Sequence, residues 1–419
     1  MKNTEHTTEK VGYKDILKQT EYLKIILAGL INRFGDSIDA IAFTWLVYAI
    51  TGNAAWSALV FAANQLPSVL VQPFAGALVE GMDKKKLMVV TDIVRGVTTS
   101  GLAILYLAGH VNPWILLLFT LINSTVEAFR LPAALAVMPQ ILEEKYYAYG
   151  TSLNSTLSTV VQMIGMGMAG VIIGAFGIGS AIVIDGISFF GSALILSFLR
   201  LKETNLRRGS LRAKEYVATL KDGLHYLKGQ PVIRNFCLLS VLINAAITPL
   251  NSLQSPLIQE VMGQGSELLS AFALAMTAGM GIGSFVYPFI SGKCSVRAQF
   301  SVTGMLVGAG MCCYTFGTGL QFSITAVYAL TIITTFVIGM SCSILVSALS
   351  VQFMRAVKQE YLARVGSIFN AGASAATPAA SLIVSALAAF CSVSQIFIFS
   401  GAICVIIFLI MRLVKVRLE

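Results

Sequence analysis

Three charged residues, Arg33, Asp36 and Asp39, interrupt the first long apolar segment of the chain. A charged side chain at the centre of a membrane-spanning helix costs about 2.5–3.5 kcal/mol, so each needs a physical reason to be there. Asn32, Asp36, Asp39 and Phe43 are spaced by four, three and four residues, which places them on one face of a helix. We therefore predict that this face lines a water-filled cavity or contacts other helices.

Carboxylates in such a cavity could bind and release protons. Burial disfavours the charged form of a carboxylate, so a cavity that alternates between wet and dry lets it collect a proton on one side of a membrane and release it on the other. Asp36, Asp39 and Glu127 are the candidates for this proton-coupling role. Arg33 precedes Asp36 by three residues and can neutralise it locally, whereas Asp39 has no such partner in its own segment.

Two further pairs of opposite charge are spaced by three residues within apolar segments. Asp92 and Arg95 lie close to the end of their segment, and we interpret them as a structural ion pair. Glu127 and Arg130 lie deeper, and the sequence leaves a structural and a functional role equally open. Asp185 has no nearby cation in the sequence, and we predict a capping or packing role for it.

The second half of the chain has no acidic residue in the middle of an apolar segment. It offers neutral polar groups instead, some of which will only bridge helices. Any proton site is therefore expected in the first half, while both halves contribute to a substrate cavity. The residues predicted to line that cavity are Asn32, Arg33, Phe43, Asn123, Arg130, Asn244, Thr248 and Asn251.

Composition identifies the elements that must position these residues. Of the 419 residues, 56% are hydrophobic and only 12% are charged, which excludes a soluble enzyme, a secreted disulfide scaffold and a free nucleic-acid-binding protein. A helix needs about 20 apolar residues to cross a bilayer. We predict an all-α polytopic membrane protein with twelve spans, at 23–48, 55–78, 87–108, 113–138, 151–176, 180–199, 233–258, 267–290, 298–317, 321–347, 366–390 and 394–412.

The positive charges indicate the topology. All but three of the 29 lysines and arginines lie in, or at the edge of, the segments that face one side of the membrane. By the positive-inside rule that side is the cytoplasm, and both termini lie there. The net charge of +9 therefore reflects topology and no nucleic-acid partner is expected. The seven cysteines lack the paired spacing of a metal site, and we expect neither a metal nor another cofactor.

The spans divide into two groups of six around a basic linker that contains an amphipathic helix. Glu144, Gly150 and Asn154 recur as Glu360, Gly366 and Asn370 at a constant offset, which indicates an internal repeat of the kind found in secondary transporters. We predict five parts, namely a cytoplasmic segment 1–22, a six-helix bundle 23–199, the linker 200–232, a second six-helix bundle 233–412 and a cytoplasmic tail 413–419.

The loop after the second span resembles the signature loop of the major facilitator superfamily, in which a glycine is followed four residues later by an acid and then by a basic cluster. The residues that carry the resemblance are Gly76, Glu80, Asp83, Lys84, Lys85 and Lys86. The family pattern more often has aspartate at the acid and arginine at position 81. The resemblance implies that this loop clamps neighbouring helices and stabilises one conformation, and that spans 1, 4, 7 and 10 line a central cavity.

Other segments resemble the branch of that superfamily that contains macrolide-efflux proteins and the enterobactin exporter. They are Gly35-Asp36, the stretch from Pro132 to Pro139, Asp185-Gly186-Ile187-Ser188-Phe189 and the stretch from Glu360 to Val365. Exporters of the superfamily often carry Gly-Pro in the fifth span, where this chain has Gly165-Met166-Gly167-Met168. The direction of transport is implied by this resemblance alone.

These observations predict a proton-driven exporter of an amphipathic small molecule, such as a drug or macrolide, in the cell membrane. It would act by alternating access, as a monomer, with a small-molecule substrate, protons and the bilayer as its partners. The alternatives are an exporter of an endogenous siderophore, peptide-like product or lysophospholipid, a non-transporting scaffold or sensor, and a pore. No histidine or cysteine cluster supports an enzyme.

Overall fold

The computed structural model describes residues 13–71, 75, 79, 82–143, 146–201, 230–291, 293–316, 323–357 and 362–413. Every regular element in these ranges is helical. Four predictions lie on other residues: the loop residues Gly76 and Glu80, the amphipathic helix of the linker, the repeat residues Glu144 and Glu360, and the chain ends 1–12 and 414–419.

The first half begins with a short helix and continues with six long ones. Their bounds are α1 (Tyr13–Ile16), α2 (Thr20–Thr51), α3 (Ala54–Leu70), α5 (Lys84–Leu107), α6 (Pro113–Ile141), α7 (Tyr147–Phe176) and α8 (Ile178–Ser197).

The second half also has six long helices, and the first of them is followed by two short turns. Their bounds are α10 (Pro231–Ser252), α11 (Gln254–Pro256), a π-helical turn η2 (Leu257–Val261), α12 (Ser266–Ser291), α13 (Val296–Phe316), α14 (Ile324–Ala356), α15 (Leu362–Leu387) and α16 (Val393–Leu413).

Each long helix covers most of one of the segments that the sequence predicted to be a span. Eight of them are long and apolar enough to cross a membrane, and α3 is a shorter apolar helix. The charged residues within α2 reduce its hydropathy although it is 32 residues long. The chain is therefore a multi-pass membrane protein, while twelve crossings and the orientation of the termini stay predictions.

Local sequence signals set the ends of several helices. Gly52 ends α2 in the left-handed region, with φ 56°, and its N–H donates to the carbonyl of Tyr48. Asn53 then caps α3 by accepting a hydrogen bond from the N–H of Ala55 at 2.8 Å. Asp83 caps α5 in the same manner. Such side-chain caps typically stabilise a helix by about 1 kcal/mol.

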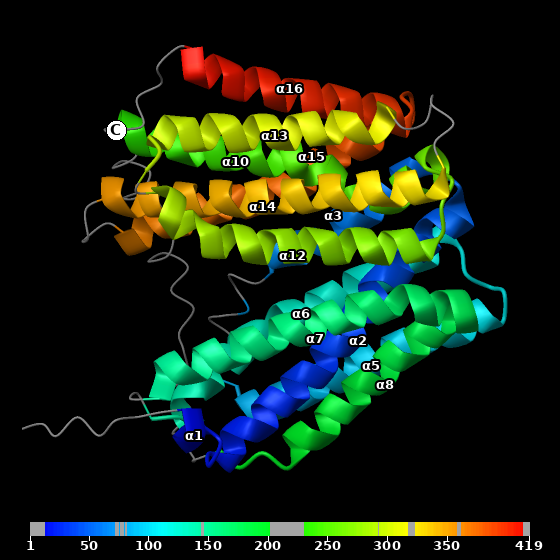
Figure 1. The fold of residues 1–419 in the computed structure, drawn as a ribbon. Coiled ribbons are helices and arrows are strands. Elements are labelled where there is room, and N and C mark those ends of the chain that lie inside the picture. Colours follow the sequence, from blue (N-terminus) through cyan, green and yellow to red (C-terminus); the bar gives the residue numbers. More distant parts are fainter. Residues whose placement is uncertain are drawn as a thin grey trace, which may run out of the picture.

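The two halves form two bundles that approach each other at one end and diverge at the other (Figure 1). The close end is the one predicted to be extracellular. There the Ser381 hydroxyl of α15 donates to the carbonyl of Ala58 on α3 at 2.7 Å, and Ser385 donates to Ala55 at 2.8 Å. The diverging end, where α1 lies, is the predicted cytoplasmic end.

Close backbone approach organises the second half. A side chain at Gly279 of α12 would overlap the carbonyl oxygen of Phe336, and one at Gly339 of α14 would overlap that of Met276. Small residues allow such close packing of helices inside a membrane. The two helices consequently lie against each other over much of their length.

Candidate functional site

A cavity of about 320 Å³ lies within the first half and is bordered on one side by the end of α10. Its wall combines carboxylates, arginines and aromatic rings from α2, α3, α5, α6 and α8. Seven of the residues predicted for the site line it, namely Arg33, Asp36, Asp39, Phe43, Asn123, Glu127 and Asn251. Sequence reasoning did not place Ser57, Asn64, Arg95 or Asp185 there, although they also line it.

Four residues predicted to line the cavity lie elsewhere. Asn32 and Arg130 bind Asp92 behind the cavity wall. Asn244 donates to the carbonyl of Ser240 at 2.9 Å, and Thr248 donates to that of Asn244 at 2.7 Å. The last two therefore satisfy their polar groups within their own helix, a common arrangement for polar side chains in a helix interior.

Arg95 joins three helices at the cavity wall. Its Nη2 lies 2.9 Å from Asp36 Oδ1 on α2 and 3.7 Å from Glu127 Oε2 on α6. Its guanidinium also lies over the ring of Phe189 on α8, 4.1 Å from the ring centroid. The side chain is only 8% exposed, so these partners replace most of its water.

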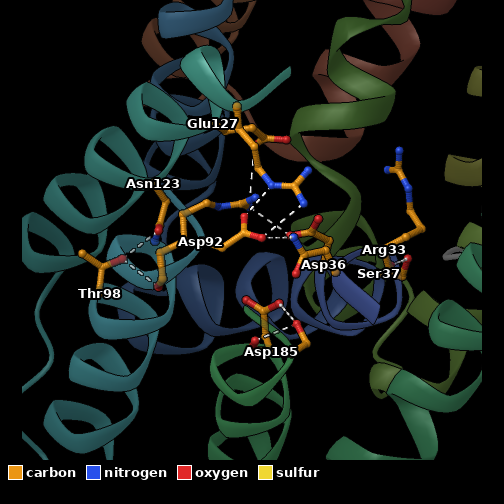
Figure 2. A network of polar contacts seen from close by, with 12 residues as sticks. Arg33, Asp36, Ser37, Asp92, Thr98, Asn123, Glu127 and Asp185 are labelled. Carbon is orange, nitrogen blue, oxygen red and sulfur yellow. Dashed lines mark hydrogen bonds and ion pairs between the residues drawn. The ribbon is translucent and has the colours of Figure 1, made fainter. Parts of the chain in front are cut away.

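Asp92 is fully buried and is the centre of a second cluster of polar side chains. It forms an ion pair with Arg130 Nε and accepts further hydrogen bonds from Ser192 Oγ at 2.6 Å and Asn32 Nδ2 at 3.2 Å. These four residues come from four different helices, α5, α6, α8 and α2. The cluster therefore ties the first bundle together, as Figure 2 shows around the labelled Asp92.

The ion pair predicted between Asp92 and Arg95 is thus wrong, and Glu127 and Arg130, whose role the sequence left open, do not pair with each other either. Arg95 pairs with Asp36 and Glu127 rather than with Asp92, and Arg130 pairs with Asp92 rather than with Glu127. The physical reason is the length of the arginine and glutamate side chains. A spacing of three residues places two side chains on one face, but packed helices bring the ends of long side chains equally close to a neighbouring helix.

Arg33 does not neutralise Asp36, contrary to the expectation from spacing. Its side chain is exposed and points away from the charged network in Figure 2, and it has no ion pair among the described residues. Its backbone carbonyl accepts a hydrogen bond from Ser37 Oγ. Arg33 is therefore a cation available at the edge of the cavity.

Glu127 is the most accessible acid of the site, because 55% of its side chain is exposed. Asn123 lies one turn before it on α6 and accepts a hydrogen bond from Thr98 Oγ1 on α5 at 2.7 Å. This bond fixes one wall of the cavity beside Glu127. The arrangement leaves the Glu127 carboxylate free to meet solvent or a ligand.

Asp39 and Asp185 differ from Asp36 and Glu127, the other acids of the cavity, because neither has an ion-pair partner among the described residues. Asp39 Oδ1 is buried without a hydrogen-bond partner in that part of the chain. Asp185 is 2% exposed and accepts only a long hydrogen bond from Ser188 Oγ, at 3.5 Å. The signal that singled out Asp39, an acid with no cation nearby in its segment, also applied to Asp185.

Comparison with known proteins gives concordant results. The model of a family described as "Transmembrane secretion effector" matches residues 15–419. The chain is 23% identical over 300 residues to the multidrug efflux pump Tap of Mycolicibacterium fortuitum, which covers 70% of this chain and 73% of that protein. It is 21% identical over 371 residues to macrolide efflux protein A of Streptococcus pyogenes, covering 87% and 88%.

Solved structures share the fold at low sequence identity. The nucleoside transporter NupG superposes with a TM-score of 0.75 at 11% identity, covering 94% of this chain and 99% of that one. A bacterial homologue of the human lysosomal transporter Spinster, in an inward-facing and unoccupied conformation, gives a TM-score of 0.65 at 14% identity, covering 97% and 96%.

Proposed function

Because the chain belongs to the transmembrane secretion effector family of the major facilitator superfamily, whose members are transporters and not enzymes, we propose that it exports amphipathic small molecules of the drug or macrolide type. Its relatives are named as multidrug and macrolide efflux pumps. The membrane in which it acts is, by this proposal, the cell membrane, and the transporting unit is a monomer.

The composition of the cavity wall carries this proposal. Four carboxylates line the cavity and only two arginines oppose them. Three phenylalanines, Phe43, Phe61 and Phe189, add apolar surface and ring faces that attract cations. Ligand sites combine an apolar wall with a few well-placed polar groups in this way, and the excess of negative charge favours an amphipathic cation.

Transport by alternating access is supported by the relation between the halves. They touch at the predicted outer end, where Tyr48 Oη of α2 donates to Glu260 at 2.9 Å, and they diverge at the other end. Rocking of two bundles about a central site would break such contacts and form new ones on the opposite side. The loop that contains Glu80 and Lys84 is proposed to clamp one of these states.

Exchange for protons is supported by the carboxylates of the first half. Asp36 and Glu127 share the single guanidinium of Arg95, and Asp39 has no cationic partner in the described structure. A cation that enters the cavity competes for these carboxylates with protons. Proton release on one side of the membrane and rebinding on the other would then couple the export of the cation to the movement of protons in the opposite direction.

An exporter of an endogenous anionic metabolite is the second candidate, and Arg33 is the observation that favours it. This exposed guanidinium lies at the edge of the cavity without an ion pair among the described residues. It could hold a carboxylate or catecholate group of a substrate. A measurement of proton flux with cationic and anionic compounds separates the two candidate functions.

The test uses purified protein in liposomes with an internal pH dye and an imposed proton gradient. Tetraphenylphosphonium, a macrolide and a catecholate siderophore are added to the wild type and to Asp39→Asn, with the surface variant Asp15→Asn as the matched control. We expect a substrate-dependent proton flux with the cationic compounds that Asp39→Asn abolishes and Asp15→Asn retains. A flux unchanged by Asp39→Asn at every pH contradicts the coupling, and flux with the siderophore alone favours the second candidate.

A further inference from the structure

Asp185 and Asp39 come from different helices, α8 and α2, and both line the wall of the same cavity. The backbone of α2 approaches α8 at Gly35, where a Cβ atom would lie 2.7 Å from Asp185 Oδ1 and would overlap Ser188 Oγ. Glycine at this position is therefore what allows the Asp185 carboxylate to lie against α2.

Helix geometry brings Asp39 to the same point. Residues 35 and 39 are four apart, so they lie one above the other on one face of α2. A helical side chain leans toward the preceding turn, and the Asp39 carboxylate consequently extends over the turn that contains Gly35.

The nearby cations are already engaged by other carboxylates. Arg95 binds Asp36 and Glu127, and Arg130 binds Asp92. Arg33 points away from the network. Helix α7, which also packs against α2 and α8, has no acidic or basic residue in its described part, and α12 presents only Glu267, near Gly174 at the other end of α7.

Asp39 and Asp185 line one cavity and have no ion-pair partner among the described residues, so ionising both carboxylates is costly in free energy. An isolated buried charge costs several kcal/mol, and two like charges at one site add their repulsion. A single proton removes one charge and gives the pair an O–H donor. It would also satisfy the buried Asp39 Oδ1, which has no hydrogen-bond partner in the described structure.

We propose that Asp39 and Asp185 form a carboxyl pair that holds one proton between α2 and α8, and that a cation entering the cavity displaces this proton. The assignment rests on the proposed function and deepens it, because it adds Asp185 to the coupling site and separates this pair from Asp36 and Glu127. The proton leaves as the cation arrives, so the charge in the cavity is unchanged.

The first experiment needs no substrate. Infrared spectra of the detergent-purified wild type and variants are recorded at neutral pH and compared. They report the C=O stretching band of protonated carboxylic acids. We expect this band in the wild type, its loss in Asp39→Asn and in Asp185→Asn, and its retention in the control Asp15→Asn, which alters an acid outside the cavity that pairs with Lys18. A band that persists in Asp39→Asn or in Asp185→Asn overturns the pair.

Gly35→Ala tests the geometry without removing an acid. The added methyl group would overlap Ser188 Oγ and the Asp185 carboxylate, so α8 must shift and the band should weaken or move. Asp185→Glu keeps a carboxyl group and should restore the band that Asp185→Asn loses. A band identical to that of the wild type in Gly35→Ala contradicts the placement of Asp185 against Asp39.

The second experiment measures proton release when tetraphenylphosphonium binds in weakly buffered detergent solution. The wild type and Asp15→Asn should release one proton per bound cation, and Asp39→Asn and Asp185→Asn should release none. Binding with equal proton release in all four proteins overturns the displacement step. If no cation binds, the proposed function fails for cations while the infrared result still decides whether the carboxyl pair exists.

Discussion

The two halves of the molecule share a six-helix plan and hold their helices together by different means. In the first half, arginine–carboxylate contacts such as Arg130–Asp92 and Arg95–Asp36 cross from helix to helix. In the second half, helices α12 and α14 meet through glycines, and Ser284 and Ser343 share a hydrogen bond at 2.5 Å. Among the residues of the second half that the structure describes, the acids are Glu260 and Glu267, and both lie at the predicted outer ends of their helices.

This difference indicates that the two halves have different roles. The neutral contacts in the second half have no group that titrates or attracts an ionic ligand, and in the proposed mechanism they would form the rigid part against which the other half moves. The first half accepts the cost of buried charge, and buried ionisable groups within membranes usually mark ion or substrate pathways. The following predictions test the comparison from the largest expected effect to the smallest.

Removing Asp92 should destabilise the first half more than any other single change. Asp92→Ala leaves Arg130 buried without its partner and removes the acceptor of Ser192 and Asn32. Breaking a buried ion pair by removing one partner costs about 3–5 kcal/mol. Thermal unfolding in detergent should show a large loss of stability, and Asp39→Asn, the control at an unpaired acid, should show little.

The stability of the second half should depend on side-chain volume where its helices meet rather than on charged residues. Gly339→Val places a side chain against the backbone of Met276 on α12, and overpacking of this kind costs about 1–3 kcal/mol. Gly281→Val is the matched control, because a Cβ there meets nothing within 4 Å. Equal unfolding temperatures for the two variants would contradict the close packing of α12 and α14.

Asp39→Asn should reduce the affinity for a lipophilic cation while the protein stays folded. Contacts to charged groups contribute about 1.5–3 kcal/mol, so we expect at least about tenfold weaker binding of tetraphenylphosphonium. Equilibrium binding of the radiolabelled cation measures this. Asn251→Ala, a neutral residue of the cavity wall contributed by α10, should have a smaller effect if the first half supplies the charge recognition.

The smallest effect is expected at the contact between the halves. Tyr48→Phe removes the hydrogen bond to Glu260, which contributes about 1 kcal/mol to the closed outer end. The population with an open outer end should rise about fivefold, since 1.4 kcal/mol corresponds to a factor of ten. Spin-label distances across that end measure the shift, and an unchanged distance distribution would show that this bond does not hold the halves together.

Much of the architecture could be predicted from the sequence because a membrane imposes long apolar helices. The long helices α8 and α13 match the spans predicted at 180–199 and 298–317 within a few residues. The face of α2 that carries Asp36, Asp39 and Phe43 does line the cavity. Its fourth member, Asn32, turns to Asp92 instead, since the turns at the two ends of a face meet different neighbouring helices.

Partners across helices could not be predicted. The sequence paired Arg95 with Asp92 and left the role of Glu127 and Arg130 open. In the packed bundle Arg95 contacts Asp36 and Glu127, and Arg130 contacts Asp92. Sequence reasoning also assigned Asp185 a structural role, whereas the approach of α8 to Gly35 places its carboxylate in the cavity. No spacing within one helix contains this information.

The amino-acid sequence by itself determined which segments form long apolar helices, which half carries the charge and which face of α2 is polar. These features follow from the local periodicity of a helix and from the cost of charge in an apolar medium. Tertiary structure alone decided which two of the four cavity carboxylates contact an arginine and which two have no such contact among the described residues. That outcome depends on how neighbouring helices approach, and the ends of long side chains select their partners only after the helices have packed.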